Sequence, residues 1–260
     1  MTTLLLRLAG PLQAWGSAAR FARRGTENAP TKSGVLGLLA AAQGRPRNAD
    51  LTDLAALRFG VRIDQPGSRL RDFQTAHHGD TDKAMPVSAR FYLADAVFVA
   101  GVEGDSTLLQ DLHEALAAPY FLPYLGRRSC PPSRPVHMGP PLDAPLEDAL
   151  RDAPWQASAW YVRQLERTAR RQGNPAGSGH QTLDVLTDCP PSQTPHLSQR
   201  DTPVSFDPRH RRYALRGIHT DSIPAPAAAP PQGPHDPTSV LAPVHPLRQG
   251  DASRSLPETS

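Results

Sequence analysis

Two adjacent arginines, Arg127 and Arg128, are the residues whose type and spacing best suit the binding of a charged ligand. Glycine and prolines flank them and restrain the loop, so guanidinium and backbone N–H groups keep a fixed arrangement. Such groups bind phosphate oxygens. The loop therefore predicts a grip on nucleic acid, with an ordinary solvated arginine pair as the alternative. The residues of this loop expected to contact the nucleic acid are Tyr124, Gly126, Arg127, Arg128 and Ser129.

A second group of candidates precedes an apolar stretch at residues 35–42. Pro30 and the polar residues after it predict the start of a helix, where unpaired N–H groups and the helix dipole favour a phosphate. An ordinary N-cap is the alternative for the hydroxyl residues, and the two roles are compatible. The candidates are Thr31, Lys32, Ser33 and Gly34.

Gln13 and Trp15 follow a turn at Gly10-Pro11 and offer a base-edge contact and a stacking face. The alternative for Trp15 is burial in the core. Cys130 is expected to be a small apolar filler rather than a reactive thiol.

The composition is that of a soluble protein with a sizeable core, since 38% of its 260 residues are hydrophobic. Of 28 basic residues only Lys32 and Lys83 are lysine, which favours phosphate binding or reflects a general preference for arginine. Two cysteines exclude a disulfide framework and suggest a reducing cytoplasm. The apolar run at residues 4–6 is too short for a signal peptide or a membrane span. We expect no cofactor and no bound metal.

Hydrophobic periodicity predicts an α+β fold. The order of strand, helix, two or more strands, helix and a last strand near Val136 indicates a ferredoxin-like βαββαβ domain over residues 1–140. Residues 71–97 predict a long β-hairpin around a polar tip. Residues 141–217 predict a smaller β-rich region, with a strand at residues 160–162. Residues 218–260 are rich in Pro and Ala without aromatic residues, which predicts a disordered tail. Strands are expected at residues 4–8, 59–64, 69–75, 90–93 and 96–100, and helices at 34–42, 51–57 and 107–117.

Four blocks in this order resemble the CasD family, the e-type members of the fifth Cas family in the type I-E CRISPR surveillance complex Cascade. The likeness spans most of residues 3–138, and the stretch at 200–211 extends it. The blocks are Leu6-Arg7-Leu8-Ala9-Gly10-Pro11-Leu12-Gln13-Ala14-Trp15-Gly16, Pro30-Thr31-Lys32-Ser33-Gly34-Val35-Leu36-Gly37-Leu38-Leu39, Leu70-Arg71-Asp72-Phe73-Gln74-Thr75 and Tyr124-Leu125-Gly126-Arg127-Arg128-Ser129-Cys130-Pro131.

The resemblance implies a non-catalytic RNA-binding subunit that caps the 5′ handle of the CRISPR RNA, with Arg71 added to the RNA-contacting residues. It implies that the hairpin is a thumb that reaches the neighbouring backbone subunit and kinks the guide. Other implied partners are the large subunit and, indirectly through the complex, target DNA. The thumb residues singled out are His77, His78, Lys83, Arg90 and Tyr92.

Two other functions stay open. Relatives in another CRISPR subtype cut precursor RNA without metal, and His77, His78, Lys83 and Tyr92 are suitable acid–base groups. Against this, nothing in a polar tip holds a general base in place. A structural adaptor that touches only protein is the second alternative, but residues 1–216 carry 26 basic and 21 acidic residues, a surplus of five that favours a polyanion.

Overall fold

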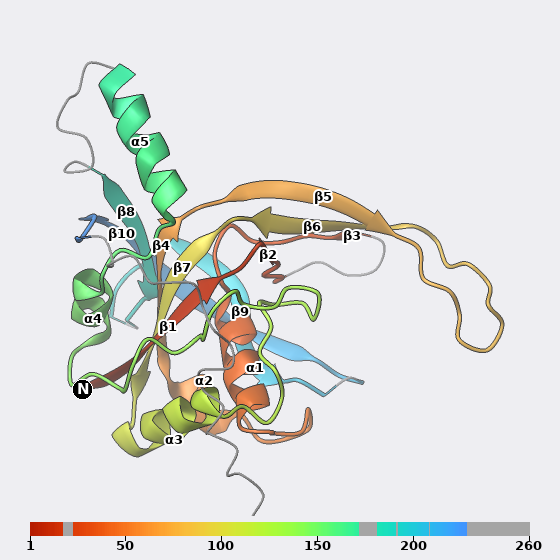
Figure 1. Ribbon diagram of the computed structural model, residues 1–260. Coiled ribbons are helices and arrows are strands. Elements are labelled where there is room, and N and C mark those ends of the chain that lie inside the picture. Colours follow the sequence, from red (N-terminus) through yellow and green to blue (C-terminus); the bar gives the residue numbers. More distant parts are fainter. Residues whose placement is uncertain (18–22, 172–180, 191, 208, 228–260) are drawn as a thin grey trace, which may run out of the picture. The chain divides into compact units, whose positions relative to one another are not determined.

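The computed structural model describes residues 1–17, 23–171, 181–190, 192–207 and 209–227. Its largest element is a six-stranded sheet, ordered β1-β7-β4-β8-β10-β9, in which every neighbouring pair is antiparallel (Figure 1). The fold class is therefore α+β, with the large sheet as its framework. The strands are β1 (Thr2–Ala9), β7 (Val97–Gly104), β4 (Arg58–Gln65), β8 (Thr182–Asp188), β10 (Arg212–Pro224) and β9 (Leu197–Ser205).

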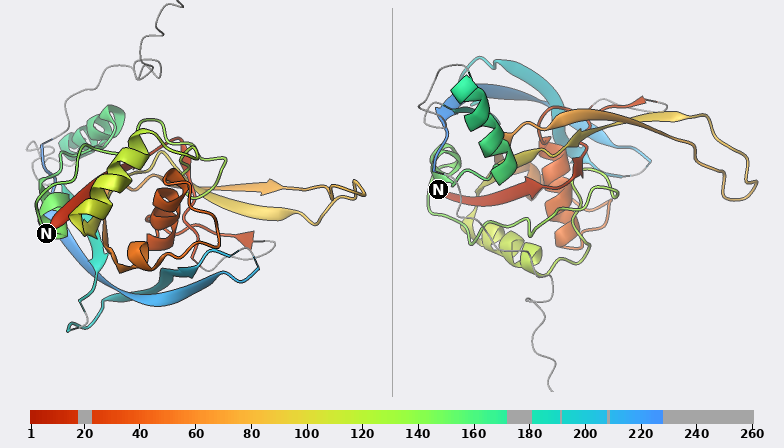
Figure 2. Two further views of the ribbon diagram at one scale, coloured as in Figure 1. Left: turned by 90° about the horizontal axis from the view of Figure 1, so that it is seen from below. Right: turned by 45° about the horizontal axis from the view of Figure 1, so that its top comes forward.

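A second sheet is built around a long hairpin. Strand β5 (Ser68–Gln74) pairs with β6 (Ser88–Ala94), and the short strands β2 (Leu12–Gln13) and β3 (Arg23–Arg24) pair with the other edge of β6. Figures 1 and 2 show the hairpin extending away from the six-stranded sheet to a tip loop. Only an isolated bridge between His77 and Ala84 continues the pairing into the tip.

Helices cover both faces of the large sheet. Helices α1 (Lys32–Ala42), α2 (Thr52–Ala56) and α3 (Ser106–Ala117) enclose one apolar core with β1, β4 and β7. Helix α4 (Leu146–Asp152) and the apolar side of α5 (Ala159–Arg171) enclose a second core on the opposite face. The alternation of side chains along β1 explains the division, since Leu4 and Leu6 belong to the first core and Leu5 to the second.

The close approach of α4 to the sheet depends on a glycine in the sheet. Gly101 lies in the central strand β7, and a Cβ atom there would come 2.6 Å from Leu146 Cδ1 of α4. Leu146 and Leu150 fill this space and are fully buried. Glycine therefore sets the distance between helix and sheet at this point.

The N-terminal half agrees with the sequence pattern. The expected strands and helices between residues 4 and 117 all occur, with bounds shifted by a few residues. The N-cap of α3 is Asp105, whose carboxylate accepts a hydrogen bond from Leu108 N–H at 3.0 Å. The hairpin also occurs, but it spans residues 68–94, because Val97 already begins β7 of the large sheet.

The C-terminal half departs from the sequence pattern. Residues 141–217 are not a separate region, because β8, β9 and β10 complete the six-stranded sheet and Met1–Pro230 form one compact unit. The predicted strand at residues 160–162 is wrong, since these residues lie in α5. The tail cannot begin at Ile218, because β10 continues to Pro224 and pairs with β8 over that length. The rest of the predicted tail, residues 228–260, lies outside the described residues.

Candidate nucleic-acid groove

A groove of about 1130 Å³ lies beside α1 and combines positive charge with aromatic rings. None of the described residues that line it is acidic. Guanidinium groups and ring faces suit a single-stranded nucleic acid, whose phosphates and unstacked bases need these partners. Of the groove arginines, Arg45 is already paired with Asp53. The arginines are Arg24, Arg45, Arg47, Arg127, Arg128 and Arg211. The aromatic residues, apart from Trp15, are Tyr120, Phe121, Tyr124, Phe206 and Tyr213.

Backbone hydrogen bonds hold the loop that carries several of these residues. Tyr120 N–H donates to the carbonyl of Ala42 at the end of α1 (2.9 Å), and Leu125 N–H donates to the carbonyl of Cys130 (2.7 Å). Gly126 has φ +81° and lies so close to the carbonyl of Ala14 that any Cβ would overlap it. The loop therefore keeps one conformation against the body of the protein, as the flanking glycine and prolines predict.

The two adjacent arginines have different environments. Arg127 is half-buried: its guanidinium donates to the carbonyls of Phe91 (3.1 Å) and Arg24 (2.9 Å) and lies 4.7 Å from the ring centre of Tyr92. These contacts join the loop to β6 and β3. Arg128 is exposed. The sequence analysis gave both arginines the same role. In the structure, Arg128 is an exposed residue of the groove, whereas Arg127 mainly joins the loop to β6 and β3.

The other residues of the loop divide in the same way. Tyr124 and Gly126 line the groove, as predicted. Ser129 is exposed but is not among the residues that line it. Cys130 is 1% exposed, and burial raises the pKa of its thiol, which agrees with the expected role as an apolar filler.

The N-terminus of α1 is occupied by groups from the protein itself. Thr31 Oγ1 accepts a hydrogen bond from Gly34 N–H (3.2 Å), which is the N-cap alternative. Lys32 N–H donates to the Asp201 carboxylate (2.8 Å), so a carboxylate from β9 already lies where an RNA phosphate was predicted. Thr31, Ser33 and Gly34 do line the groove, but they form part of its floor.

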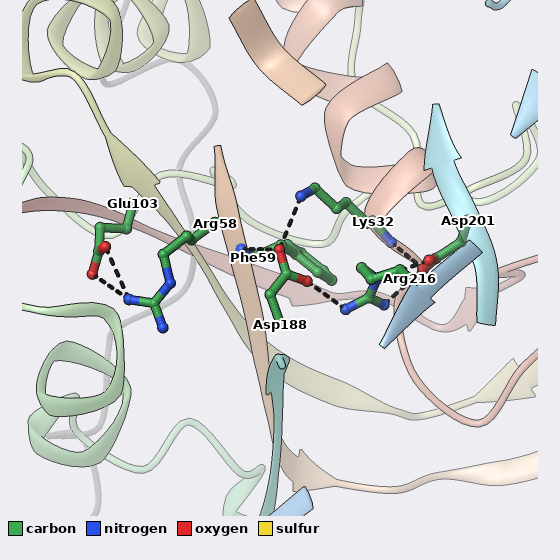
Figure 3. Close-up of polar contacts among 7 residues, drawn as sticks. All are labelled: Lys32, Arg58, Phe59, Glu103, Asp188, Asp201 and Arg216. Carbon is green, nitrogen blue, oxygen red and sulfur yellow. Dashed lines mark hydrogen bonds and ion pairs between the residues drawn. The ribbon is translucent and has the colours of Figure 1, made fainter. Parts of the chain in front are cut away.

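Lys32 belongs to a buried charge network between strands, shown in Figure 3. Its ammonium contacts Asp188 at 2.9 Å, and Asp188 also accepts from Phe59 N–H (3.0 Å) and the Arg216 guanidinium (2.8 Å). Arg216 donates two further hydrogen bonds to Asp201, both 2.8 Å. The prediction that Lys32 contacts RNA is therefore wrong, because its side chain is committed to Asp188.

This network supports one wall of the groove. It joins α1 and β4 to β8, β9 and β10, and the segment around the β9–β10 turn carries Phe206, Arg211 and Tyr213. A second pair in Figure 3, Arg58 with Glu103 at 2.9 Å, joins β4 to β7. Buried ion pairs with saturated hydrogen bonds fix how elements meet rather than bind ligands.

Gln13 and Trp15 are also structural. Both side chains are 0% exposed, and Gln13 Nε2 donates to the carbonyls of Leu8 (3.0 Å) and Ala96 (2.8 Å). Trp15 Nε1 donates to Gln13 Oε1 at 3.0 Å, which satisfies the buried indole. The predicted base contacts are wrong for both residues, since no base can reach a side chain that is wholly covered. Trp15 is instead buried in the core, which was the alternative prediction.

The hairpin residues do not converge on a site. His77 lies in the tip, where its Nδ1 contacts Asp82 Oδ1 at 3.1 Å, and His78 and Lys83 are exposed nearby. Tyr92 is 3% exposed and pairs in register with Leu70 near the base of the hairpin, under Arg127. Tyr92 is therefore not a tip residue. Arg71 is exposed on β5 and Arg90 half-buried on β6, and neither lines the groove.

Sequence reasoning missed most of the arginines and aromatic residues of the groove. The residues it did not select are Arg24, Arg45, Arg47, Arg211, Tyr120, Phe121, Phe206 and Tyr213. One signal was present: Tyr120 and Phe121 lie between Pro119 and Pro123, Tyr124 follows directly, and Tyr120 and Phe121 are 74% and 51% exposed. Rings held outward in a restrained loop are typical of binding surfaces. The remaining residues come from distant parts of the chain.

Within the described residues, no helix is both long and apolar enough to cross a bilayer.

Comparison with known proteins agrees with this picture. The family model described as CRISPR-associated protein (Cas_Cas5) matches residues 3–218. The CRISPR system Cascade subunit CasD of Escherichia coli (strain K12) is 36% identical over 157 residues, which cover 52% of this chain and 70% of that protein.

Two solved structures resemble the chain over most of its length. One is described as a crystal structure of a Cas protein, with a TM-score of 0.66, 36% identity, and coverage of 88% of this chain and 100% of that chain. The other is a chain of a CRISPR RNA-guided surveillance complex, with a TM-score of 0.70, 32% identity, and coverage of 89% and 95%.

Proposed function

Because this chain belongs to the CRISPR-associated Cas5 family, we propose that it is a subunit of a Cascade-type surveillance complex and holds the 5′ handle of the CRISPR RNA in its basic groove. The observation that carries the proposal is the composition of the groove, which unites arginines and aromatic rings and has no acidic residue among the described residues that line it. Phosphates contact the arginines, and unstacked bases lie on the rings.

Within this groove we assign phosphate binding to exposed arginines on opposite walls. Arg128 belongs to the loop at residues 120–131, and Arg211 belongs to the turn between β9 and β10. Both are exposed, and no ion pair between either residue and another described residue competes for its guanidinium. A strand that passes between them would be held from both sides.

The test is the binding of single-stranded repeat RNA to the variant Arg128→Ala/Arg211→Ala. Each lost charge-assisted hydrogen bond to phosphate costs about 1.5 to 3 kcal/mol, so affinity should fall by at least roughly tenfold while thermal melting stays unchanged. Arg151→Ala, which removes an exposed arginine of α4, is the control and should bind normally. Unchanged RNA affinity in the double variant would contradict the proposal.

We also propose that the subunit is not a nuclease. Of the candidate acid–base groups, Tyr92 lies far from the other three: it is opposite Leu70, whereas His77 is opposite Ala84 in the tip. Seven residues separate Leu70 from His77, which is about 23 Å at the rise of an extended chain, so Tyr92 cannot act on the same phosphodiester as His77. The remaining three, His77, His78 and Lys83, are exposed in the tip, where no packing holds a general base in place, and this supports a binding role over the metal-independent endoribonuclease.

The hairpin itself is proposed to be the thumb that contacts the backbone subunit. Its surface carries apolar side chains that the isolated chain leaves exposed, among them Phe73 (69%) and Val87 (60%).

We also propose that residues 1–140 have a ferredoxin-like arrangement. The order β1-β7-β4 and the antiparallel bridges from Leu6 to His137 and from Thr3 to Leu142 along the free edge of β1 support it. Contact with the large subunit and indirect contact with target DNA follow from the same family membership.

A further inference from the structure

Helix α5 (Ala159–Arg171) lies on the opposite face of the large sheet from α1 and α3 and takes no part in the groove (Figures 1 and 2). None of its residues is fully buried. Tyr161, Val162 and Leu165 pack against the second core and hold the helix to the sheet. The rest of its surface faces solvent, and the proposed function leaves it without a role.

The solvent side of α5 is a stripe of arginines. Arg163, Arg167, Arg170 and Arg171 follow the spacing i, i+4, i+7 and i+8, which places them on one face of a helix, opposite the apolar residues. All four side chains are exposed. Eight residues of helix separate the first from the last, so the four charges lie within roughly 12 Å along the axis.

No internal anion neutralises this arginine stripe in the described part of the chain. Its arginines are absent from the ion pairs there, whereas Arg151 on the neighbouring α4 pairs with Asp148 at 2.5 Å. Glu166, the one acidic residue of α5, borders the stripe, three residues after Arg163 and four before Arg170, and forms no ion pair with a described residue. Residues 172–180, which follow, contain no Asp or Glu. Four like charges at this density repel one another, so a ligand of matching negative charge density is favoured.

We propose that the arginine stripe of α5 binds the phosphate backbone of a nucleic-acid duplex. A duplex carries one charge per about 1.7 Å of axis, so a 12 Å length holds roughly seven phosphates, and those on the near side face the stripe. Protein surfaces intersperse both signs of charge and offer no such density. A single strand needs ring faces as well, and α5 exposes only one large ring to any extent, Trp160 at 47%. The groove and α5 therefore take different nucleic acids on opposite faces of the sheet.

The test measures binding of a DNA duplex of about 20 base pairs by fluorescence anisotropy over a series of salt concentrations, with the full chain. In Arg163→Gln/Arg167→Gln/Arg171→Gln, affinity at low salt should fall at least roughly tenfold, and the slope of log K against log salt should shrink by about 2.7, or 0.9 for each lost phosphate contact. Glutamine has nearly the helix propensity of arginine, so the helix should persist.

Two controls make the result specific. Arg163→Lys/Arg167→Lys/Arg171→Lys keeps the charges and should bind the duplex within about threefold of wild type, with an unchanged salt slope. Arg151→Gln removes an exposed, paired arginine on the same face of the sheet and should leave duplex binding unaltered.

Several outcomes would overturn the proposal. Wild-type affinity and slope in the glutamine variant would remove α5 from duplex binding. Equal loss in the lysine variant would show that the shape of the helix, not its charge, matters. Intact duplex binding with failed assembly onto other subunits would assign the stripe to a protein surface. The ligand differs from the single-stranded repeat RNA that tests the groove, so either hypothesis can fail without the other.

Discussion

The buried charge network and the groove use the same residue type in opposite ways. In the network, Arg216 is enclosed with Asp188 and Asp201, and every charge has a partner within 3 Å. In the groove, Arg128 and Arg211 are exposed, and the described lining contains no acid. The role of an arginine therefore depends on nearby carboxylates. A guanidinium paired with buried carboxylates joins strands, whereas an unpaired, exposed guanidinium is available to a polyanion.

The largest effect should come from breaking the network. Asp201 is 0% exposed and receives two hydrogen bonds from Arg216 and one from Lys32 N–H. Asp201→Ala leaves Arg216 buried with one carboxylate fewer and should lower the free energy of unfolding by about 3 to 5 kcal/mol, measured by denaturant unfolding. Asp148→Ala, at an exposed pair, should cost no more than about 0.5 kcal/mol. Equal costs in the two variants would contradict the distinction.

A smaller effect should separate the two adjacent arginines. Arg127→Ala removes hydrogen bonds to the carbonyls of Phe91 and Arg24 and the contact with Tyr92, and should cost about 1.5 to 3 kcal/mol of stability. Arg128→Ala should leave stability within about 0.5 kcal/mol and weaken binding of repeat RNA instead. Melting and RNA titration of both variants check this. If Arg128→Ala lowers melting as much as Arg127→Ala, the assignment of Arg128 to the groove is wrong.

A small effect on stability should come from the hairpin tip, which has neither a buried charge nor a core contact. Replacing residues 77–85 with a short Gly/Ser turn should change the free energy of unfolding by no more than about 0.5 to 1 kcal/mol, because these residues are exposed. Assembly of the complex with guide RNA should fail, as followed by size-exclusion chromatography. Normal co-elution of all subunits would refute the thumb role.

Local patterns determined the N-terminal half of the fold. The alternation at residues 59–64 and the apolar stretch at residues 35–42 each depend on neighbours in sequence, and β4 and α1 are found where they were predicted. The loop at residues 124–131 and its glycine were recognised for the same reason, because restraint by Gly and Pro is a property of the chain itself.

Long-range contacts determined the rest. Whether Lys32, Gln13 or Arg127 faces RNA depends on Asp188, Ala96 and Phe91, which lie 156, 83 and 36 residues away. Residues 218–224 belong to a strand because β8 offers them a pairing edge, whereas their composition alone predicted a tail. The sequence by itself determined which residues are charged, restrained or apolar. Only the tertiary structure decided which charges are neutralised, because a distant carboxylate or carbonyl becomes a partner only when the sheet is assembled.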